Sequence, residues 1–458
     1  MTAVGIDIGY QSQPNCLDIK HIPGDTGLPY LGKIFPMIKD FRGVVEDHVH
    51  RFGHVSRFSM GGQTGLLITH ADHLRDIYLD RDRNFSPMMG YAGVLGRFYG
   101  GGLLMRDFEN HRVHRRIFQN SFKNNAMKGY VEIMNPTLDE GMSGWDQIAD
   151  FHFFPQIKEL LLDVASRVFI GVEELTGTEN EKLNRAFLDI AEKGLMAFIR
   201  AEIPGLAFAK GMKGKRYLES YLRSLIAVRR AGDGKDTMSM IVKERDDEGN
   251  YWPDADLVPH LSFLLFAAHD TTTSALNHML MYLGKPEHHH IQEELRQFSL
   301  SLNKPFLEYE DLDQMTGLDN CFMEGLRLYP SVSLMTRRTV RECELGGYRV
   351  PANTLLFVVP QWAHRDPEIW TNPNTFDPDR WGAERAEQKN HSFGFVGFGG
   401  GAHKCIGMHF ANMQVKLFMH RFLQKYRFST PENYAPWMQT IPLPKPGDNL
   451  PLRIERIV

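Results

Sequence analysis

This sequence of 458 residues has few cysteines, no long apolar run and no excess of basic residues. Cys16, Cys321, Cys343 and Cys405 follow no paired spacing and no secretory signal is present, so we expect no disulfide framework and a cytoplasmic location. The apolar run Leu257–Ala268 has 12 residues, fewer than the roughly 18 that cross a bilayer, so we expect no transmembrane anchor. Lys and Arg number 52 against 56 Asp and Glu, a balance that argues against a nucleic-acid partner.

The residue pattern indicates one large domain over residues 1–458, mainly α-helical with small β-sheets, an α+β class. No Pro, Gly or Ser-rich linker and no fixed repeat divides the chain. We expect residues 1–33 to form an N-terminal extension and an entry loop punctuated by Pro and Gly. Short alternating runs predict a small antiparallel sheet over Val55–Thr69, and helical periodicity continues from there to about Leu328.

Two segments combine apolar residues with helix-breaking or basic ones. Phe85–Met105 contains six glycines, and we expect a mobile apolar loop there rather than a nucleotide cradle, because no Walker pattern is present. Gly205–Leu218 mixes apolar residues with four Lys or Arg. We interpret it as a solvated loop, with peripheral contact to a membrane surface as the alternative.

A long buried helix is predicted from Asp254 or Asp256 to Leu283, because its apolar residues occupy most sides of the helix. Within it, Asp270 is a carboxylate that is costly to bury unless it has a partner or a task. The hydroxyl of Thr271 could bond the carbonyl of Ala267 and bend the helix. The alternative is an acid paired with a distant arginine and threonines that only pack.

The segment FGGGAHKCIG, Phe398–Gly407, has the features of a loop that holds a thiolate. Its three consecutive glycines, Gly399 to Gly401, allow the backbone to approach a flat cofactor closely. A helix is predicted just after Cys405, and its N-terminal amides would lower the pKa of that thiol. Such a thiolate is a good axial ligand for haem iron, although a lone cysteine is more often an inert buried residue.

The residues of this segment match the haem-binding signature of the cytochrome P450 family: Phe398, Gly401, His403, Cys405 and Gly407. The sequence therefore resembles that family. The resemblance implies a cytochrome P450-type fold with haem b, iron protoporphyrin IX, between the long central helix and the loop that carries the Cys405 ligand. It also implies a haem-thiolate monooxygenase that inserts one oxygen atom from O2 into its substrate.

Other segments resemble the same family in the right order. Glu324 and Arg327 of EGLR, which alone would suggest a surface ion pair, resemble the family's buried structural cluster with Arg380 as its third member. The resemblance makes Asp270 and Thr271 the catalytic pair, in which Thr271 hydrogen-bonds dioxygen and Asp270 relays protons to it.

The segment Glu109–Phe122 resembles the family's third helix, which contacts a haem propionate. His111 then occupies the position of the usual Trp and Arg115 that of the basic residue, while His403 stands where Arg is common. Arg337 is a further candidate for a propionate contact. Each of the two imidazoles, His111 and His403, could instead be an ordinary polar core residue.

The resemblance also implies an external source of electrons, because no flavin or reductase domain is fused to the chain. We expect a ferredoxin-type donor with its reductase. Arg112, Arg116 and Lys404 could form a basic patch that steers an acidic donor, although a solvated face is an equal alternative. We expect the protein to be a monomer.

The expected pocket walls are apolar and suit a small lipophilic substrate of sterol, terpenoid, retinoid or fatty acyl type. They comprise Met88, Met89, Tyr91, Phe98, Phe263, Phe266, Ala267, Val332, Leu334 and Met335. The His-containing cysteine loop resembles the branch with sterol demethylases and retinoid hydroxylases, although Asp270 departs from the usual sterol demethylase pattern.

Two other functions remain open at this point. One is a haem-thiolate isomerase or peroxygenase that needs no reductase, against which Asp270 and Thr271 argue. The other is a non-catalytic haem-binding or lipid-binding protein.

Overall fold

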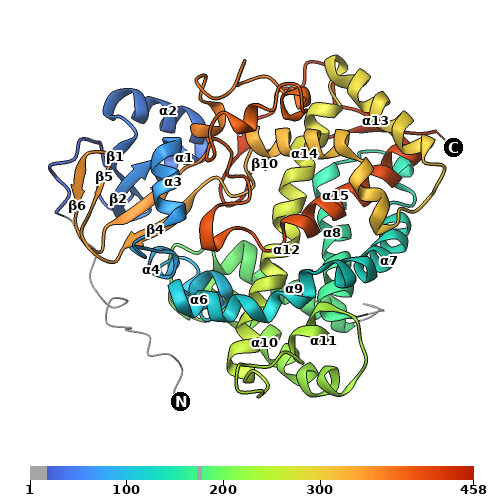
Figure 1. Cartoon of the computed structure of the whole chain (residues 1–458), viewed down its shortest axis with the longest axis horizontal. Coiled ribbons are helices and arrows are strands. Elements are labelled where there is room, and N and C mark those ends of the chain that lie inside the picture. Colours follow the sequence, from blue (N-terminus) through green and yellow to red (C-terminus); the bar gives the residue numbers. More distant parts are fainter. Residues whose placement is uncertain (1–17, 173–177, 458) are drawn as a thin grey trace.

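The computed structural model describes residues 18–172 and 178–457 and is mainly helical (Figure 1). The helices of the first half are α1 Ile34–Lys39, α2 Phe41–Phe52, α3 Ala71–Leu79, α4 Pro87–Tyr91, α5 Gly96–Tyr99, α6 Phe108–Arg115, α7 Asn124–Gly141, α8 Phe153–Ala165 and α9 Thr178–Leu188. Those of the second half are α10 Ala207–Ala231, α11 Thr237–Ile241, α12 Asp254–Leu283, α13 His289–Ser301, α14 Thr316–Leu328 and α15 Met408–Lys425.

One five-stranded sheet, with the order β1-β2-β7-β4-β3, lies at one end of the molecule beside α1, α2 and α3 (Figure 1). Its strands are β1 Val55–Met60, β2 Gln63–Ile68, β7 Leu355–Val358, β4 Met335–Thr339 and β3 Phe85–Ser86. Only β2 and β7 pair in parallel; the antiparallel β1–β2 hairpin confirms the sheet predicted over Val55–Thr69. The two-stranded sheets pair β5 Cys343–Leu345 with β6 Tyr348–Val350, β8 Tyr426–Ser429 with β11 Arg453–Arg456, and β9 Met438–Gln439 with β10 Lys445–Pro446.

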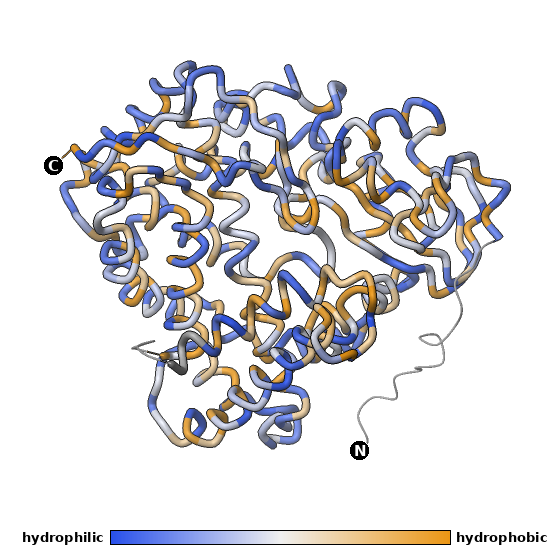
Figure 2. The backbone as a smooth tube through the Cα atoms, turned by 180° about the vertical axis from the view of Figure 1, so that it is seen from behind, coloured by the Kyte–Doolittle hydropathy of each residue, from blue (hydrophilic) through white to orange (hydrophobic). Residues whose placement is uncertain are grey.

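The central helix α12 has 30 residues and passes through the helical part of the molecule (Figure 1). At 1.5 Å per residue it is about 45 Å long. Most of its side chains are buried, in one apolar cluster with residues of α7, α8, α14 and α15. Hydrophilic stretches predominate in the outer turns around this core (Figure 2). The predicted bounds and burial of this helix are therefore confirmed.

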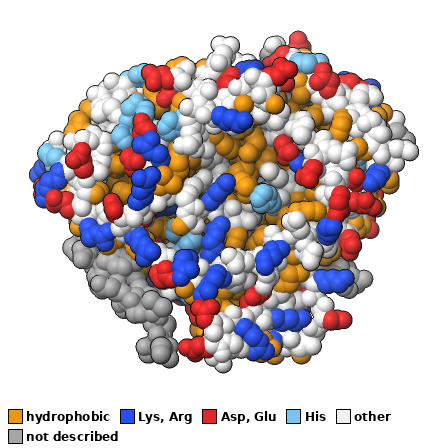
Figure 3. Space-filling model, in the orientation of Figure 1, with side chains coloured by type: hydrophobic (Ala, Val, Ile, Leu, Met, Phe, Trp, Pro, Cys, Tyr) orange, Lys and Arg blue, Asp and Glu red, His pale blue; other side chains and the backbone are white. Residues whose placement is uncertain are grey.

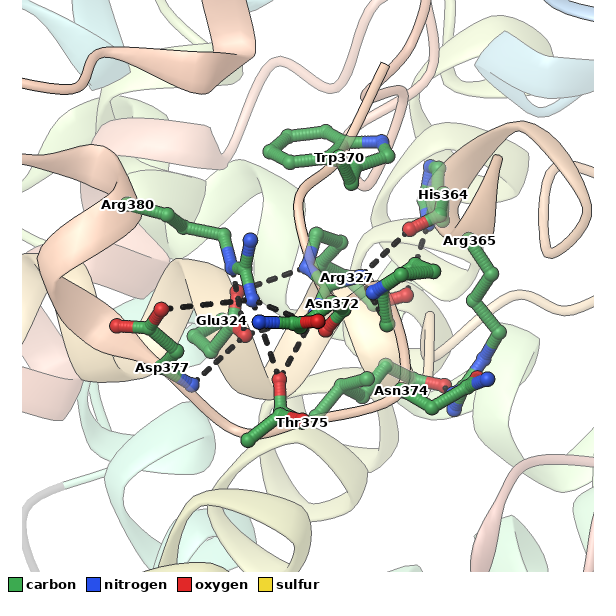
Figure 4. A network of polar contacts seen from close by, with 12 residues as sticks. Glu324, Arg327, His364, Arg365, Trp370, Asn372, Asn374, Thr375, Asp377 and Arg380 are labelled. Carbon is green, nitrogen blue, oxygen red and sulfur yellow. Dashed lines mark hydrogen bonds and ion pairs between the residues drawn. The ribbon is translucent and has the colours of Figure 1, made fainter. Parts of the chain in front are cut away.

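A buried ionic cluster fixes α14 to the segment that follows β7 (Figure 4). Glu324 is fully buried, and its two carboxylate oxygens accept hydrogen bonds from Arg327 at 2.7 and 2.8 Å and from Arg380 at 3.0 Å. The Trp381 indole and the backbone N–H of Asp377 also donate to it, each at 3.0 Å. Five donors therefore compensate the cost of burying this carboxylate.

The structure corrects two expectations about loops. Phe85–Met105 is not a loop throughout: it contains β3, α4, α5 and a turn of 3₁₀ helix, and Met89 and Phe98 are buried in it. Gly205–Leu218 lies largely in α10, where Phe208 and Met212 are buried against neighbouring helices. Periodic burial of apolar side chains outweighs the local glycines and lysines in both segments. Within the described residues, no helix is long and apolar enough to cross a membrane.

Candidate functional site

A cavity of about 300 Å³ lies between α12 and the loop that precedes α15. Its walls are predominantly apolar, and polar groups reach it mainly at one edge. Six of the residues predicted to bind the cofactor are not glycine, and all six line this cavity: His111, Arg115, Arg337, Phe398, His403 and Cys405. Thr271 of the predicted catalytic pair lines it as well. Gly407 also lines it, whereas Gly401 does not.

The loop around Cys405 is closed by backbone hydrogen bonds. The N–H of Cys405 donates to the carbonyl of Phe398 at 2.9 Å, and a positive φ of 60° places Gly401 in the left-handed region. A Cβ atom at Gly401 would lie only 1.7 Å from the carbonyl oxygen of Tyr78, in α3. Glycine is therefore required at this position by close backbone packing as well as by its φ angle.

Burial raises the pKa of the Cys405 thiol. The Gly407 backbone N–H and the cations Arg115 and Lys404 oppose this shift, but burial is the larger effect. For the thiol without a metal, the expectation of a lowered pKa is therefore wrong. The sulfur faces a cavity enclosed by protein, and this environment disfavours the charged thiolate. A cation at the sulfur would supply the counter-charge that the thiolate needs.

The buried cluster of α14 is connected to this loop through His364. The Arg327 guanidinium donates to the His364 carbonyl at 2.7 Å, and the backbone N–H of Val396 donates to His364 Nε2 at 2.9 Å. His364 Nε2 must therefore be an unprotonated acceptor, and burial accordingly lowers the pKa of His364 to about 3. The Glu324 cluster thus braces the chain a few residues before the cysteine loop.

The polar edge of the cavity carries four basic side chains. The rings of His111, in α6, and His403, in the cysteine loop, are stacked with centroids 3.7 Å apart. Arg115 donates to the carbonyl of Lys404 at 2.8 Å, and Arg337 of β4 lies with its Cζ 5.8 Å from the centroid of the Tyr78 ring. Burial, with the nearby cations, lowers the pKa of His403 to about 2 and that of His111 to about 4.

These groups fit haem. A sulfur on one wall can hold a metal, the apolar walls suit a porphyrin, and the basic edge suits its two anionic propionates. Cys405, the glycine loop and the four basic residues converge on the same cavity from separate parts of the sequence. Cys405 would bind the iron, and Arg115, Arg337, His111 and His403 would bind the propionates.

On the opposite wall, α12 carries the predicted alcohol. The Thr271 hydroxyl donates to the carbonyl of Ala267 at 2.9 Å, as predicted, and both residues line the cavity. The Ser331 hydroxyl donates to the Thr271 carbonyl at 2.8 Å and fixes this part of the helix to the segment after α14.

Asp270 does not line the cavity, in contrast to the expectation that it stands beside Thr271 at the reaction centre. Its carboxylate lies 3.6 Å from the Lys158 ammonium of α8 and 3.3 Å from the buried His269 ring. Lys158 in turn pairs with Glu192 at 2.7 Å. A helix directs successive side chains about 100° apart, so Asp270 and Thr271 face different surroundings.

Half of the predicted substrate residues line the cavity: Tyr91, Phe263, Ala267, Val332 and Met335. The other five are placed elsewhere by packing. Phe98 is buried against Phe208 with centroids 5.3 Å apart, and Phe266 stacks on Tyr99 at 4.5 Å. Met88, Met89 and Leu334 also lie outside the cavity walls.

Sequence reasoning missed several lining residues, among them Leu103, Leu104, Phe169 and Ser331. Phe169 belongs to a π-helical turn after α8, far from every recognised motif. Leu103 and Leu104 directly follow the last glycine of the glycine-rich segment. This apolar pair could have been used to predict two further lining residues.

The expected basic patch is partly neutralised. Arg112 pairs with Glu109, and Arg116 makes two hydrogen bonds of 3.0 Å to Asp247. Figure 3 nevertheless shows basic side chains gathered over the part of this face where α6 lies.

The sequence matches the family model of cytochrome P450 over residues 22–450. The chain belongs to the cytochrome P450 family. It is 36% identical over 441 residues to cytochrome P450 136 of Mycobacterium tuberculosis, covering 95% of this chain and 88% of the relative. It is 26% identical to cytochrome P450 120 of Synechocystis, covering 95% of this chain and 97% of that one. The structure of retinoic acid bound cyanobacterial CYP120A1 superposes with a TM-score of 0.83 at 26% identity, covering 95% of this chain and 99% of that one.

This P450 therefore has the expected fold, with haem as its cofactor and a monooxygenase activity as its reaction class. Family membership also implies redox partners, O2 and a lipophilic substrate.

Proposed function

We propose that this P450 hydroxylates an elongated lipophilic molecule of terpenoid or retinoid type. The observation that carries the proposal is the shape of the site: one apolar cavity has Cys405 on one wall and Ala267 and Thr271 of α12 on the other. Tyr91, Phe263, Val332 and Met335 add to its apolar lining. The similar CYP120A1 structure holds retinoic acid, which supports the retinoid end of this range.

Bound haem would supply the chemistry that cleaves the O–O bond, with the Cys405 thiolate donating electron density. The protein's own contribution is to exclude water, orient the substrate and deliver protons. The Thr271 hydroxyl lies at the α12 wall and donates a hydrogen bond to the Ala267 carbonyl. If this hydrogen bond breaks, the hydroxyl can donate to dioxygen instead.

Asp270 delivers protons from the surface side of α12 in this proposal. The carboxylate lies beside Lys158, which is 16% exposed, and through it reaches the half-exposed Glu192. Rotation of the Asp270 side chain toward Thr271 would carry a proton across the helix. Lys158 is a positioning residue, because it holds Asp270 in the outward orientation.

Electrons would come from a ferredoxin-type protein and its reductase. The basic side chains over α6, which Figure 3 shows, support docking of an acidic donor near the cysteine loop. Such docking should weaken as ionic strength rises, because salt screens charges on the surface.

The test is a titration of the haem-loaded protein with retinoids, diterpenoids, sterols and fatty acids, followed by the haem spin-state spectrum. Product analysis with a surrogate ferredoxin system then identifies oxygenated products. Ala267→Phe should abolish binding of long ligands, whereas Met88→Leu, which lies off the cavity, should leave it unchanged. No spectral response to any of the four classes, or equal binding by both variants, would contradict the proposal.

A further inference from the structure

A second cavity, of about 250 Å³, lies between α2 and the segment that follows β7. It shares no lining residue with the cavity that contains Cys405. Its walls carry charge as well as apolar surface: Arg42, Glu46 and His50 come from α2, and Gln361, Trp362 and Arg365 come from the other side.

Arg365 is a buried cation without an anionic partner. Its side chain is 9% exposed and makes no ion pair with any described carboxylate within 4.0 Å. One terminal nitrogen donates to the Asn374 side-chain oxygen at 2.8 Å and the other to the carbonyl of Leu328 at 2.7 Å. The Nε–H has no hydrogen-bond partner within the described part of the chain.

Figure 4 shows the same arrangement. The Arg365 side chain extends toward Asn374 and away from Glu324 and Asp377, the carboxylates of the neighbouring cluster. Burial, together with the positive charges of Arg42 and Arg327, lowers the pKa of Arg365 to about 10, so the guanidinium remains charged at neutral pH. The ring of Tyr329, whose centroid lies 5.6 Å from the Arg365 Cζ, also stabilises this charge.

The other residues that line the cavity add a second positive charge and a polar atom without a hydrogen-bond partner. Arg42 is the second guanidinium of the cavity, and Glu46, which it contacts at 2.6 Å, is the single carboxylate in the walls. Two arginines against one glutamate leave a formal excess of one positive charge. Gln361 is 6% exposed, and its side-chain oxygen is buried without a partner among the described residues.

We propose that this cavity binds a small oxyanion, a phosphate or a carboxylate group, between Arg365 and Arg42. Guanidinium groups bind both oxyanions through paired charge-assisted hydrogen bonds, and a buried cation without a counter-charge is costly. The amide of Gln361 can turn to donate its NH₂ to the same ligand. The half-buried Trp362 ring and Val45 form an apolar side, which would accept the organic part of a carboxylate or phosphate ester.

An anion at this position would join three parts of the fold. Arg42 belongs to α2 and Arg365 follows β7. A terminal nitrogen of Arg365 donates to the carbonyl of Leu328 at the end of α14. Occupation should therefore stabilise the folded protein by linkage and raise its unfolding temperature with ligand concentration. The haem-loaded spectrum should not change, because the two cavities have no residue in common.

The experiment is thermal unfolding of the haem-loaded protein with inorganic phosphate, with benzoate and with chloride at equal ionic strength. Trp362 fluorescence is read in parallel, with Trp362→Phe identifying its share of the signal. We expect a saturable rise in unfolding temperature and a Trp362 response with phosphate, benzoate or both, and none with chloride. The comparison of the two ligands distinguishes a phosphate site from a carboxylate site.

Asn374→Asp is the decisive variant, because it places a carboxylate at hydrogen-bond distance from Arg365 with almost no change of shape. We expect it to unfold at a higher temperature in chloride and to lose the response to the anion. Arg42→Gln, at a half-exposed position, should weaken binding about tenfold. The proposal is overturned if chloride matches both oxyanions, or if Asn374→Asp retains the full response.

Discussion

Replacing Glu324 by Gln should strongly destabilise this P450, although the two side chains have nearly the same shape. The two carboxylate oxygens accept five hydrogen bonds, from Arg327, Arg380, Trp381 and the backbone of Asp377. An amide nitrogen in place of the less-used oxygen would face two of these donors, the Arg327 Nε–H and the Trp381 indole N–H. Those donors would be left unpaired in a fully buried environment.

The loss of charge adds to this cost. Arg327 and Arg380 are both fully buried, and the remaining counter-charges, Glu387 at 2.7 Å and Asp377 at 3.7 Å, both contact Arg380. Removing one partner of a buried ion pair typically costs about 3–5 kcal/mol of unfolding free energy. His364 would also lose the fixed position of Arg327 on which its bond to Val396 depends.

The assay is urea unfolding followed by far-UV circular dichroism and by haem absorbance. Glu342→Gln is the matched control, because Glu342 pairs with Arg349 at 2.6 Å on the exposed surface. We expect Glu324→Gln to lower the midpoint markedly and to release haem early, and Glu342→Gln to leave both unchanged. Equal midpoints for the two variants would refute the reasoning.

Three further predictions concern catalysis and pH. Thr271→Ala should divert reducing equivalents from product to peroxide, while Thr271→Ser retains coupling; unchanged product per electron in the Ala variant would exclude the role proposed for this hydroxyl. Lys158→Met should free Asp270 and alter the pH dependence of turnover without altering substrate affinity, and an unchanged pH profile would remove Lys158 from the proton route. Burial holds the pKa of His364 at about 3, below its usual 6.5. The unfolded chain therefore binds a proton that the folded one does not, and this histidine should contribute a loss of stability of at most about 1.4 kcal/mol per pH unit as pH drops from 6.5 toward 3. Denaturation series in which His364→Gln shows the same slope as the parent protein would contradict this contribution.

The sequence predicted those parts of the fold that local pattern determines. The bounds of α12 follow from its largely apolar surface, and the β1–β2 hairpin follows from two short alternating runs. The short helices within Phe85–Met105 could not be predicted, because packing of Met89 and Phe98 against distant helices overrides six helix-breaking glycines. The local pattern of residues along the chain contains no information on contacts between distant segments.

In the site too, local motifs predicted some features, whereas contacts between distant segments determine the others. Short motifs identified the residues that converge on the cavity, including Cys405 and Thr271. The orientation of Asp270 depends instead on Lys158, which lies on another helix and belongs to no motif. The pKa of the metal-free Cys405 thiol is raised instead of lowered, because a helix N-terminus is visible in a sequence and the burial of the thiol by the surrounding protein is not.

The ferrous carbon monoxide spectrum of the haem-loaded protein tests the central proposal, that the Cys405 sulfur would bind the haem iron. We expect the long-wavelength Soret band that a thiolate ligand produces, and its loss in Cys405→His with haem still bound by the cavity. A wild-type spectrum like that of a globin, or a long-wavelength band that persists in the variant, would contradict the account.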